Sequence, residues 1–96
     1  MPTYTFTDKA ESDLEGIIDF TIEHWGKPQA TKYIDGLEEL AQAIADNPGI
    51  GIARDELSAG LSSIPYQSHI LYYMQSSSSV TIVRVLHASM DSINHF

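Results

Sequence analysis

The run Val80–Leu86 carries apolar residues at both sets of alternating positions. Successive side chains of a strand point to opposite faces, so an edge strand with one solvated face shows a cleaner alternation of apolar and polar residues. β-branched residues dominate the run, as is typical of strands. We therefore predict a central strand that is covered on both faces, with Arg84 as the single charged residue within it. Val80, Ile82 and Leu86 are expected on one face.

Three other segments have the composition of strands. His69–Met74 is rich in Ile, Leu and Tyr, and the serines of Ser76–Ser79 predict a turn between it and the central strand. Thr3–Phe6 alternates between polar and aromatic residues, which predicts a short first strand. Leu61–Ile64 predicts a brief strand that ends in a turn at residues 65–68, because Pro65 interrupts the pattern.

Two helices are predicted between the first strand and the others. Thr7 is a suitable N-cap for the first helix, and Gly26 a suitable end. The apolar face of this helix is expected to comprise Ala10, Leu14, Ile17, Ile18, Thr21 and Trp25. Pro28 suits the first turn of a second helix, which Asn47-Pro48-Gly49 ends. Its apolar face is expected to comprise Ala30, Tyr33, Ile34, Leu37, Leu40, Ala41 and Ile44. Phe20 falls outside the first apolar face, which hints at an exposed apolar spot for a protein partner.

The order of elements predicts an α+β fold. Strand, helix, helix, strand, strand, strand is typical of an antiparallel helical hairpin packed on a small antiparallel sheet, with Gly49–Gly60 as a loop. With 96 residues the chain is expected to form a single domain, residues 1–96.

Composition excludes several classes of function. Lys and Arg number 5 against 13 Asp and Glu, for a net charge of −8, which disfavours direct binding to nucleic acid or to an anionic membrane. Cysteine is absent, so there is neither a disulfide framework nor a thiolate site. The N-terminus lacks the pattern of a signal peptide, and no apolar run approaches the ~20 residues of a membrane span. We expect a cytoplasmic protein.

The candidate chemical sites each have a plainer structural explanation. Arg84 within a buried strand needs an acidic partner, and Asp91, Asp55 and Glu56 are the expected candidates. The histidines His24, His69, His87 and His95 lie in different elements without the spacing of a zinc site, so no metal and no cofactor is expected. Ser89 and His87 could form a nucleophile–base pair, but the sequence places no acid to orient the base.

A family resemblance rests on segments distributed over nearly the whole chain. Arg84–Asp91 (RVLHASMD), preceded by His69–Tyr73 (HILYY), resembles the C-terminal signature of ParE toxins in the RelE/ParE toxin–antitoxin superfamily. Upstream segments similar to ParE sequences follow in the right order: Trp25-Gly26, Asn47–Gly51, Arg54–Leu57 and Gly60–Pro65. The fold of that family is a helical hairpin on a small antiparallel sheet.

The resemblance implies a toxin without catalytic activity that acts by binding. It implies neutralisation by a ParD-like antitoxin in a hetero-oligomer, and DNA gyrase as the target. The motif match assigns partner binding to Arg54, His69, Arg84, His87, Met90 and Asp91. A net charge of −8 departs from the basic character of many ParE toxins, so either the pairing is mostly apolar or the antitoxin segment is less acidic than usual.

Two alternatives remain open from the sequence. One is a ribosome-dependent mRNA endoribonuclease of the RelE kind, which would need a cluster of Lys and Arg in the folded cleft. The other is a non-toxic protein-binding relative that keeps the fold.

Overall fold

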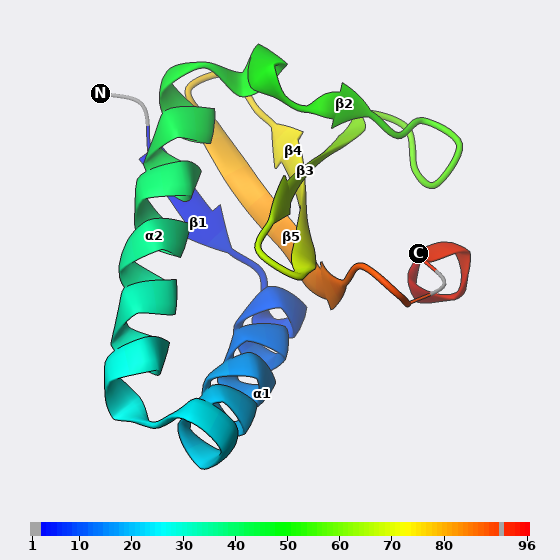
Figure 1. Ribbon diagram of the computed structural model, residues 1–96. Helices are drawn as coiled ribbons and strands as arrows, with labels where there is room; N and C mark the ends of the chain where they lie inside the picture. The colour runs from blue at the N-terminus through cyan, green and yellow to red at the C-terminus, as the bar shows by residue number, and fades with distance from the viewer. Residues whose placement is uncertain (1–2, 91) are drawn as a thin grey trace.

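The computed structural model describes residues 3–90 and 92–96 and shows an α+β fold (Figure 1). Strand β1 (Thr3–Phe6) leads into helices α1 (Asp8–Trp25) and α2 (Lys27–Asp46). A 3-10 turn, η1 (Pro48–Ile50), and a two-residue strand, β2 (Ile52–Ala53), follow. The chain continues through β3 (Leu61–Tyr66), β4 (His69–Gln75), β5 (Ser79–His87) and a last 3-10 turn, η2 (Ser92–His95). The predicted fold class is confirmed.

The strands form one sheet in the order β1-β5-β4-β3-β2, which confirms β5 as an interior strand. β4 pairs with β5 antiparallel, whereas β1 pairs with it in parallel, with Thr3 opposite Ser79 and Phe6 opposite Ile82. The sheet is therefore mixed, and not antiparallel throughout as expected. Most of the chain joins β1 to β5, and so long a connection allows the parallel pairing that a hairpin turn does not.

The far edge of the sheet holds a strand that the sequence pattern does not reveal. Within the predicted loop Gly49–Gly60, the two residues of β2 pair with Ser63 and Ser62 of β3. β3 also runs past the predicted turn, through Pro65 to Tyr66. Because β2 pairs with Ser62 and Ser63 alone, none of the described strands lies beside Pro65 on that side to require the N–H that proline lacks.

The two helices begin and end as predicted. The Thr7 hydroxyl accepts a hydrogen bond from the Ala10 N–H at 3.1 Å, as an N-cap does. Gly26 alone separates the helices, and its φ of +89° is a conformation that glycine adopts without strain. No helix in the described part of the chain is both long and apolar enough to cross a membrane.

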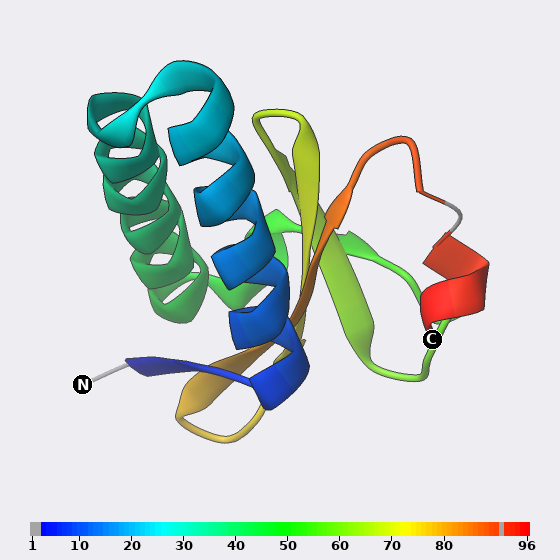
Figure 2. The same ribbon diagram turned by 90° about the horizontal axis from the view of Figure 1, so that it is seen from below.

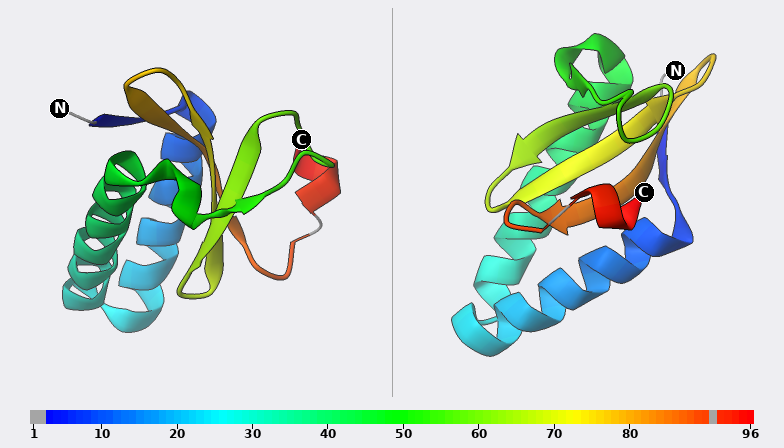
Figure 3. Two further views of the ribbon diagram at one scale, coloured as in Figure 1. Left: turned by 90° about the horizontal axis from the view of Figure 1, so that it is seen from above. Right: turned by 90° about the vertical axis from the view of Figure 1, so that its right-hand side faces the viewer.

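The helices cover one face of the sheet, and the C-terminal turn lies on the other (Figures 2 and 3). The larger core, between sheet and helices, comprises Ala10, Tyr33, Leu37, Ile44, Leu71, Tyr73, Val80, Ile82 and Val85. On the opposite face Leu61, Tyr72 and Leu86 form a smaller cluster, and the Phe96 ring lies 4.8 Å from that of Tyr72. Both faces of β5 are therefore covered, as predicted.

An irregularity in β5 changes which residues share a face. Tyr73 lies opposite Ile82 and Tyr72 opposite Arg84, so Val83 is an extra residue in β5, a β-bulge. The bulge reverses the alternation, so that Val85 joins Ile82 in the core beneath the helices and Leu86 faces the opposite side. The expectation that Leu86 shares a face with Val80 and Ile82 is therefore wrong.

Candidate partner-binding groove

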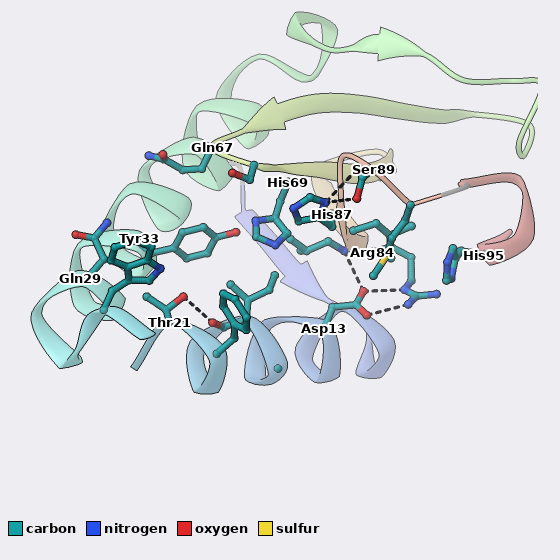
Figure 4. Close-up of a pocket in the computed structure, with 18 of the residues that line it drawn as sticks. Asp13, Thr21, Gln29, Tyr33, Gln67, His69, Arg84, His87, Ser89 and His95 are labelled. Carbon is teal, nitrogen blue, oxygen red and sulfur yellow. Dashed lines mark hydrogen bonds and ion pairs between the residues drawn. The ribbon is translucent and has the colours of Figure 1, made fainter. Parts of the chain in front are cut away.

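A groove with a volume of about 870 Å³ lies between the second half of α1 and the end of the sheet (Figure 4). Its lining comes from α1, the start of α2, the turn between β3 and β4, the end of β5 and the segment that follows β5. Five separate parts of the chain therefore meet around it, and each can be traced to a local feature of the sequence.

The first half of α1 fixes one end of the groove by closing the edge of β5 that β1 leaves open. The Thr7 N–H donates to the Ile82 carbonyl at 3.0 Å, and the Thr7 hydroxyl donates to the Val83 carbonyl at 2.8 Å. Further along the helix, Asp13 Oδ2 accepts the Val85 N–H at 3.0 Å. Backbone groups that would form an open sheet edge are therefore satisfied by α1.

Arg84 forms a two-point ion pair with Asp13 at the same end of the groove. Its Nε lies 2.7 Å from Oδ2 and its Nη2 lies 2.8 Å from Oδ1, and each side chain is 15% exposed. These hydrogen bonds raise the pKa of Arg84 above its ordinary value. The expected pairing with Asp55 or Glu56 is wrong, because their loop joins the distant strands β2 and β3. Asp91, the third expected partner, lies outside the described residues.

The second half of α1 gives the groove an apolar wall that is largely open to solvent. Phe20 is 57% exposed and Trp25 is 72% exposed, although both line the groove. Trp25 was expected to pack inward with the rest of its helical face, and this expectation is wrong. Large aromatic side chains left exposed on a concave surface are typical of a protein-binding site.

A row of polar side chains crosses the groove from α2 to the segment after β5. The rings of Tyr33 and His69 lie 5.7 Å apart edge to face, and those of His69 and His87 lie 5.4 Å apart (Figure 4). His87 Nδ1 accepts the Ser89 N–H at 3.1 Å, so a neutral His87 ring carries its hydrogen on Nε2. Burial, and then the nearby His87, lower the pKa of His69 below its ordinary value.

The groove differs in charge from the chain as a whole. The chain has 13 Asp and Glu residues, but Asp13 is the only one among the described residues that line the groove. Arg84 neutralises Asp13, which leaves Lys32, the Tyr33 phenol and the imidazoles of His69, His87 and His95 as the remaining ionisable groups of the described lining. The described lining of this concave surface therefore has no free acid, although the protein is strongly acidic.

Comparison with known proteins identifies the family. The family model described as "ParE toxin of type II toxin-antitoxin system, parDE" matches residues 4–92. The chain belongs to the ParE toxin family.

Curated ParE relatives match over almost the full length of both chains. Toxin ParE1 of Mycobacterium tuberculosis is 37% identical over 89 residues, which cover 92% of this chain and 91% of the relative. Toxin ParE1 of Caulobacter vibrioides is 34% identical over 95 residues, covering 99% and 98%. Among solved structures, the one titled "Chromosomal ParDE TA system from P. aeruginosa" has a TM-score of 0.74 at 19% identity, covering 91% of this chain and 96% of that one. This structural likeness supports the ParE fold.

The ParE groove brings together four of the six residues predicted to bind a partner. His69, Arg84, His87 and Met90 all line it. Arg54 does not, because its Nε donates to Ser63 Oγ at 2.9 Å beside β2 and β3. Asp91 lies outside the described residues. No group of three or more potential metal ligands occurs in the described part of the chain.

Sequence reasoning missed the contribution of the two helices to the groove. Asp13 and Lys32 have no role in the sequence analysis, and Tyr33 is predicted there only as part of an apolar helical face. All three line the groove, and Tyr33 also belongs to the core as predicted. No feature of the sequence marks Tyr33 as a residue of the groove, because a tyrosine within an apolar helical face is ordinarily a core residue. For Asp13, the signal was the charge of Arg84 in an apolar strand, which required an acid without saying which.

Proposed function

We propose that a ParD-type antitoxin neutralises this ParE-family toxin by laying a segment in the groove, and that the free toxin inhibits DNA gyrase by binding it. The observation that carries the antitoxin site is the exposure of Trp25 and Phe20, at 72% and 57%, on the wall of a concave surface. Burying such rings is what a partner segment gains most from. The resulting complex is a toxin–antitoxin hetero-oligomer.

Apolar burial supplies most of the affinity in this proposal, and charge sets the register of the segment. The groove has no free acid among its described residues, and Lys32 and the imidazoles face it. A segment with apolar anchors and a few acidic groups complements this surface, even though the toxin as a whole carries a charge of −8. The antitoxin therefore need not be strongly acidic.

Inhibition by binding, without catalysis, fits the chemistry of the described residues better than RNA cleavage does. Phosphate chemistry on RNA needs cationic groups aimed at the scissile phosphate. Arg84 is committed to Asp13, which leaves Lys32 as the one free Lys or Arg among the described lining residues. No carboxylate is bonded to His87 in the described contacts, so the pair with Ser89 has no third member. A gyrase target places the toxin's action in the cytoplasm.

The test is induction of the chain in a bacterial host with and without the adjacent antitoxin gene, together with a supercoiling assay on purified gyrase. Growth arrest with inhibited supercoiling, both relieved by the antitoxin, is expected. Arrest with intact supercoiling and cleaved mRNA would instead identify a ribonuclease of the RelE kind. Normal growth with folded protein present would identify a binding protein without toxicity.

A further inference from the structure

Two buried polar atoms in the groove have no hydrogen-bond partner among the described residues. They are the hydroxyl oxygen of Tyr33 and Nδ1 of His69. Tyr33 is only 9% exposed, and its hydroxyl points toward His69 in the middle of the polar row (Figure 4). A buried polar group that loses its hydrogen bonds to water without replacing them destabilises the fold, and folded proteins rarely leave one unpaired. Two such atoms in neighbouring side chains therefore require an explanation.

Other tyrosines of the core show that this chain can satisfy buried hydroxyls. The Tyr66 hydroxyl donates to the backbone carbonyl of Tyr33 at 2.7 Å. The Tyr73 hydroxyl donates to the Pro48 carbonyl at 2.7 Å and accepts the Gly51 N–H at 3.0 Å. Neither Tyr66 nor Tyr73 lines the groove, whereas Tyr33 does. The unpaired hydroxyl is thus the one that faces the partner site.

Both atoms are suited to the same kind of ligand atom. Burial, and then the nearby Tyr66, raise the pKa of Tyr33 well above its usual range, so the phenol keeps its hydrogen and can donate it. His69 Nδ1 also donates in one of its two neutral tautomers. Lys32 lies in the same lining, and the one described acid there, Asp13, is held by Arg84. With Nδ1 in its donating tautomer, two donors in a site whose described lining has no free acid favour an oxygen acceptor.

We propose that Tyr33 and His69 form a polar subsite that receives an oxygen atom, a carboxylate or a carbonyl, from the antitoxin segment in the groove. This inference rests on the proposed antitoxin site. Both atoms are shielded from solvent in the free toxin. The antitoxin segment can therefore contact them only after side chains of the groove wall have moved aside. The unpaired donors of the subsite make the free toxin slightly less stable. The subsite also fixes the register of the segment in the complex, because an apolar group at that point leaves both donors unpaired.

The test compares Tyr33→Phe with Tyr66→Phe, in the purified full chain and against the ParD-type antitoxin from the adjacent gene. Tyr33→Phe removes an unpaired hydroxyl from the free toxin, so its Tm should rise, while affinity for the antitoxin should fall roughly tenfold. Tyr66→Phe removes a hydroxyl that has a hydrogen-bond partner, from a ring whose centroid lies 5.0 Å from that of Tyr33. The Tm of this variant should fall, and its affinity for the antitoxin should not change. In Tyr33→Phe, a higher Tm together with a weaker affinity distinguishes the subsite from a structural role of the hydroxyl.

The outcomes separate this inference from the proposed function. Unchanged affinity of Tyr33→Phe for an antitoxin that binds the wild type would overturn the subsite and leave the groove as the antitoxin site. A lowered Tm for Tyr33→Phe would also overturn it, because the hydroxyl would then have a partner in the free toxin. An antitoxin that does not bind the wild type would overturn the proposed function itself.

Calorimetry near pH 6.5 in two buffers of different ionisation enthalpy identifies which oxygen the segment supplies. A carboxylate beside His69 favours the charged imidazole, so proton uptake on binding is expected, and His69→Gln should abolish it. A carbonyl gives no proton uptake and retains the tenfold loss in Tyr33→Phe. The other ionisable described residues of the lining are Asp13, Lys32, Tyr33, Arg84, His87 and His95, and all of them remain in the His69→Gln control.

Discussion

The two halves of α1 have the same amphipathic pattern, but their apolar side chains lie in different surroundings. In the first half, Ala10 is fully buried, and Thr7 and Asp13 hydrogen-bond to the backbone of β5. In the second half, Phe20 and Trp25 are mostly exposed, and the helix extends past the sheet toward Gly26 (Figure 1). The first half is bound to the sheet, whereas the second half leaves its large aromatic side chains exposed.

This difference shows how a small domain can keep large apolar side chains exposed on a concave surface. A chain of 96 residues buries a limited share of its surface, so apolar area used for a partner is lost to the core. Hydrogen bonds and an ion pair at the start of α1 anchor the helix without much apolar area. Three substitutions in α1 test this division of roles, and the pH dependence of stability tests the groove beside it.

Asp13→Ala should cause the largest effect, a loss of about 3 kcal/mol in the free energy of unfolding. The substitution leaves Arg84 and the Val85 N–H without their acceptor. Urea unfolding measures the loss, and Asp19→Ala, an exposed acid on the same helix, is the matched control with a change below about 0.5 kcal/mol. Similar small losses in both variants would show that the first half of α1 is not the anchor.

Trp25→Glu should leave stability unchanged and weaken antitoxin binding about 30-fold, or roughly 2 kcal/mol. The side chain is 72% exposed in the free toxin, so the fold gains little from it. Ile52→Glu is the matched control, because Ile52 is 59% exposed on β2 and does not line the groove. Titration calorimetry measures both affinities, and equal losses would mean that the antitoxin does not prefer the groove.

Gly16→Ala should stabilise the toxin by about 0.5–1 kcal/mol, because glycine in the middle of a helix is less favourable than alanine. Gly16 lies between the two halves of α1, and no heavy atom lies within 4 Å of the position its Cβ would occupy. Thermal unfolding measures the gain. A loss of stability would show that the two halves need flexibility between them.

The pH dependence of stability should show the smallest effect. The pKa of His69 is lowered in the fold, so the unfolded chain binds its proton more readily, and the contribution of neutral His69 is complete above about pH 6.5. It should be lost as the pH falls through the lowered pKa of the folded state. Unfolding free energies between pH 5 and 8 should therefore fall less steeply toward acid in His69→Gln than in the wild type.

Local patterns were sufficient to predict both helices and four of the five strands, but not β2. Thr7 and Gly26 mark the ends of α1 through their own hydrogen bonding and backbone conformation, and the apolar face of α2 is buried as its spacing predicts. What the sequence could not supply were relations between distant segments. The parallel pairing of β1 with β5 and the bulge at Val83 depend on neighbours rather than on local composition.

The same distinction applies to the groove. The family resemblance located four groove residues, because the two segments on which it rests meet at the end of the sheet, where His69 lies opposite His87. These residues are His69, Arg84, His87 and Met90. The exposure of Trp25 could not be predicted, because an aromatic residue on an apolar helical face is ordinarily buried and only the length of α1 relative to the sheet decides otherwise. Whether the Tyr33 hydroxyl has a hydrogen-bond partner likewise depends on which backbone groups lie near it, and the sequence does not show this.

The parallel pairing of the first strand with the last has a consequence for synthesis on the ribosome. Thr3 lies opposite Ser79, and Thr7 and Asp13 bond to residues 82–85. At ~5–20 residues per second, the start of the chain waits several seconds for its partner strand to be made. A prematurely terminated product that ends before residue 79 lacks the strand against which β1 and α1 dock. Such fragments cannot form the groove, because the end of β5 supplies part of its lining.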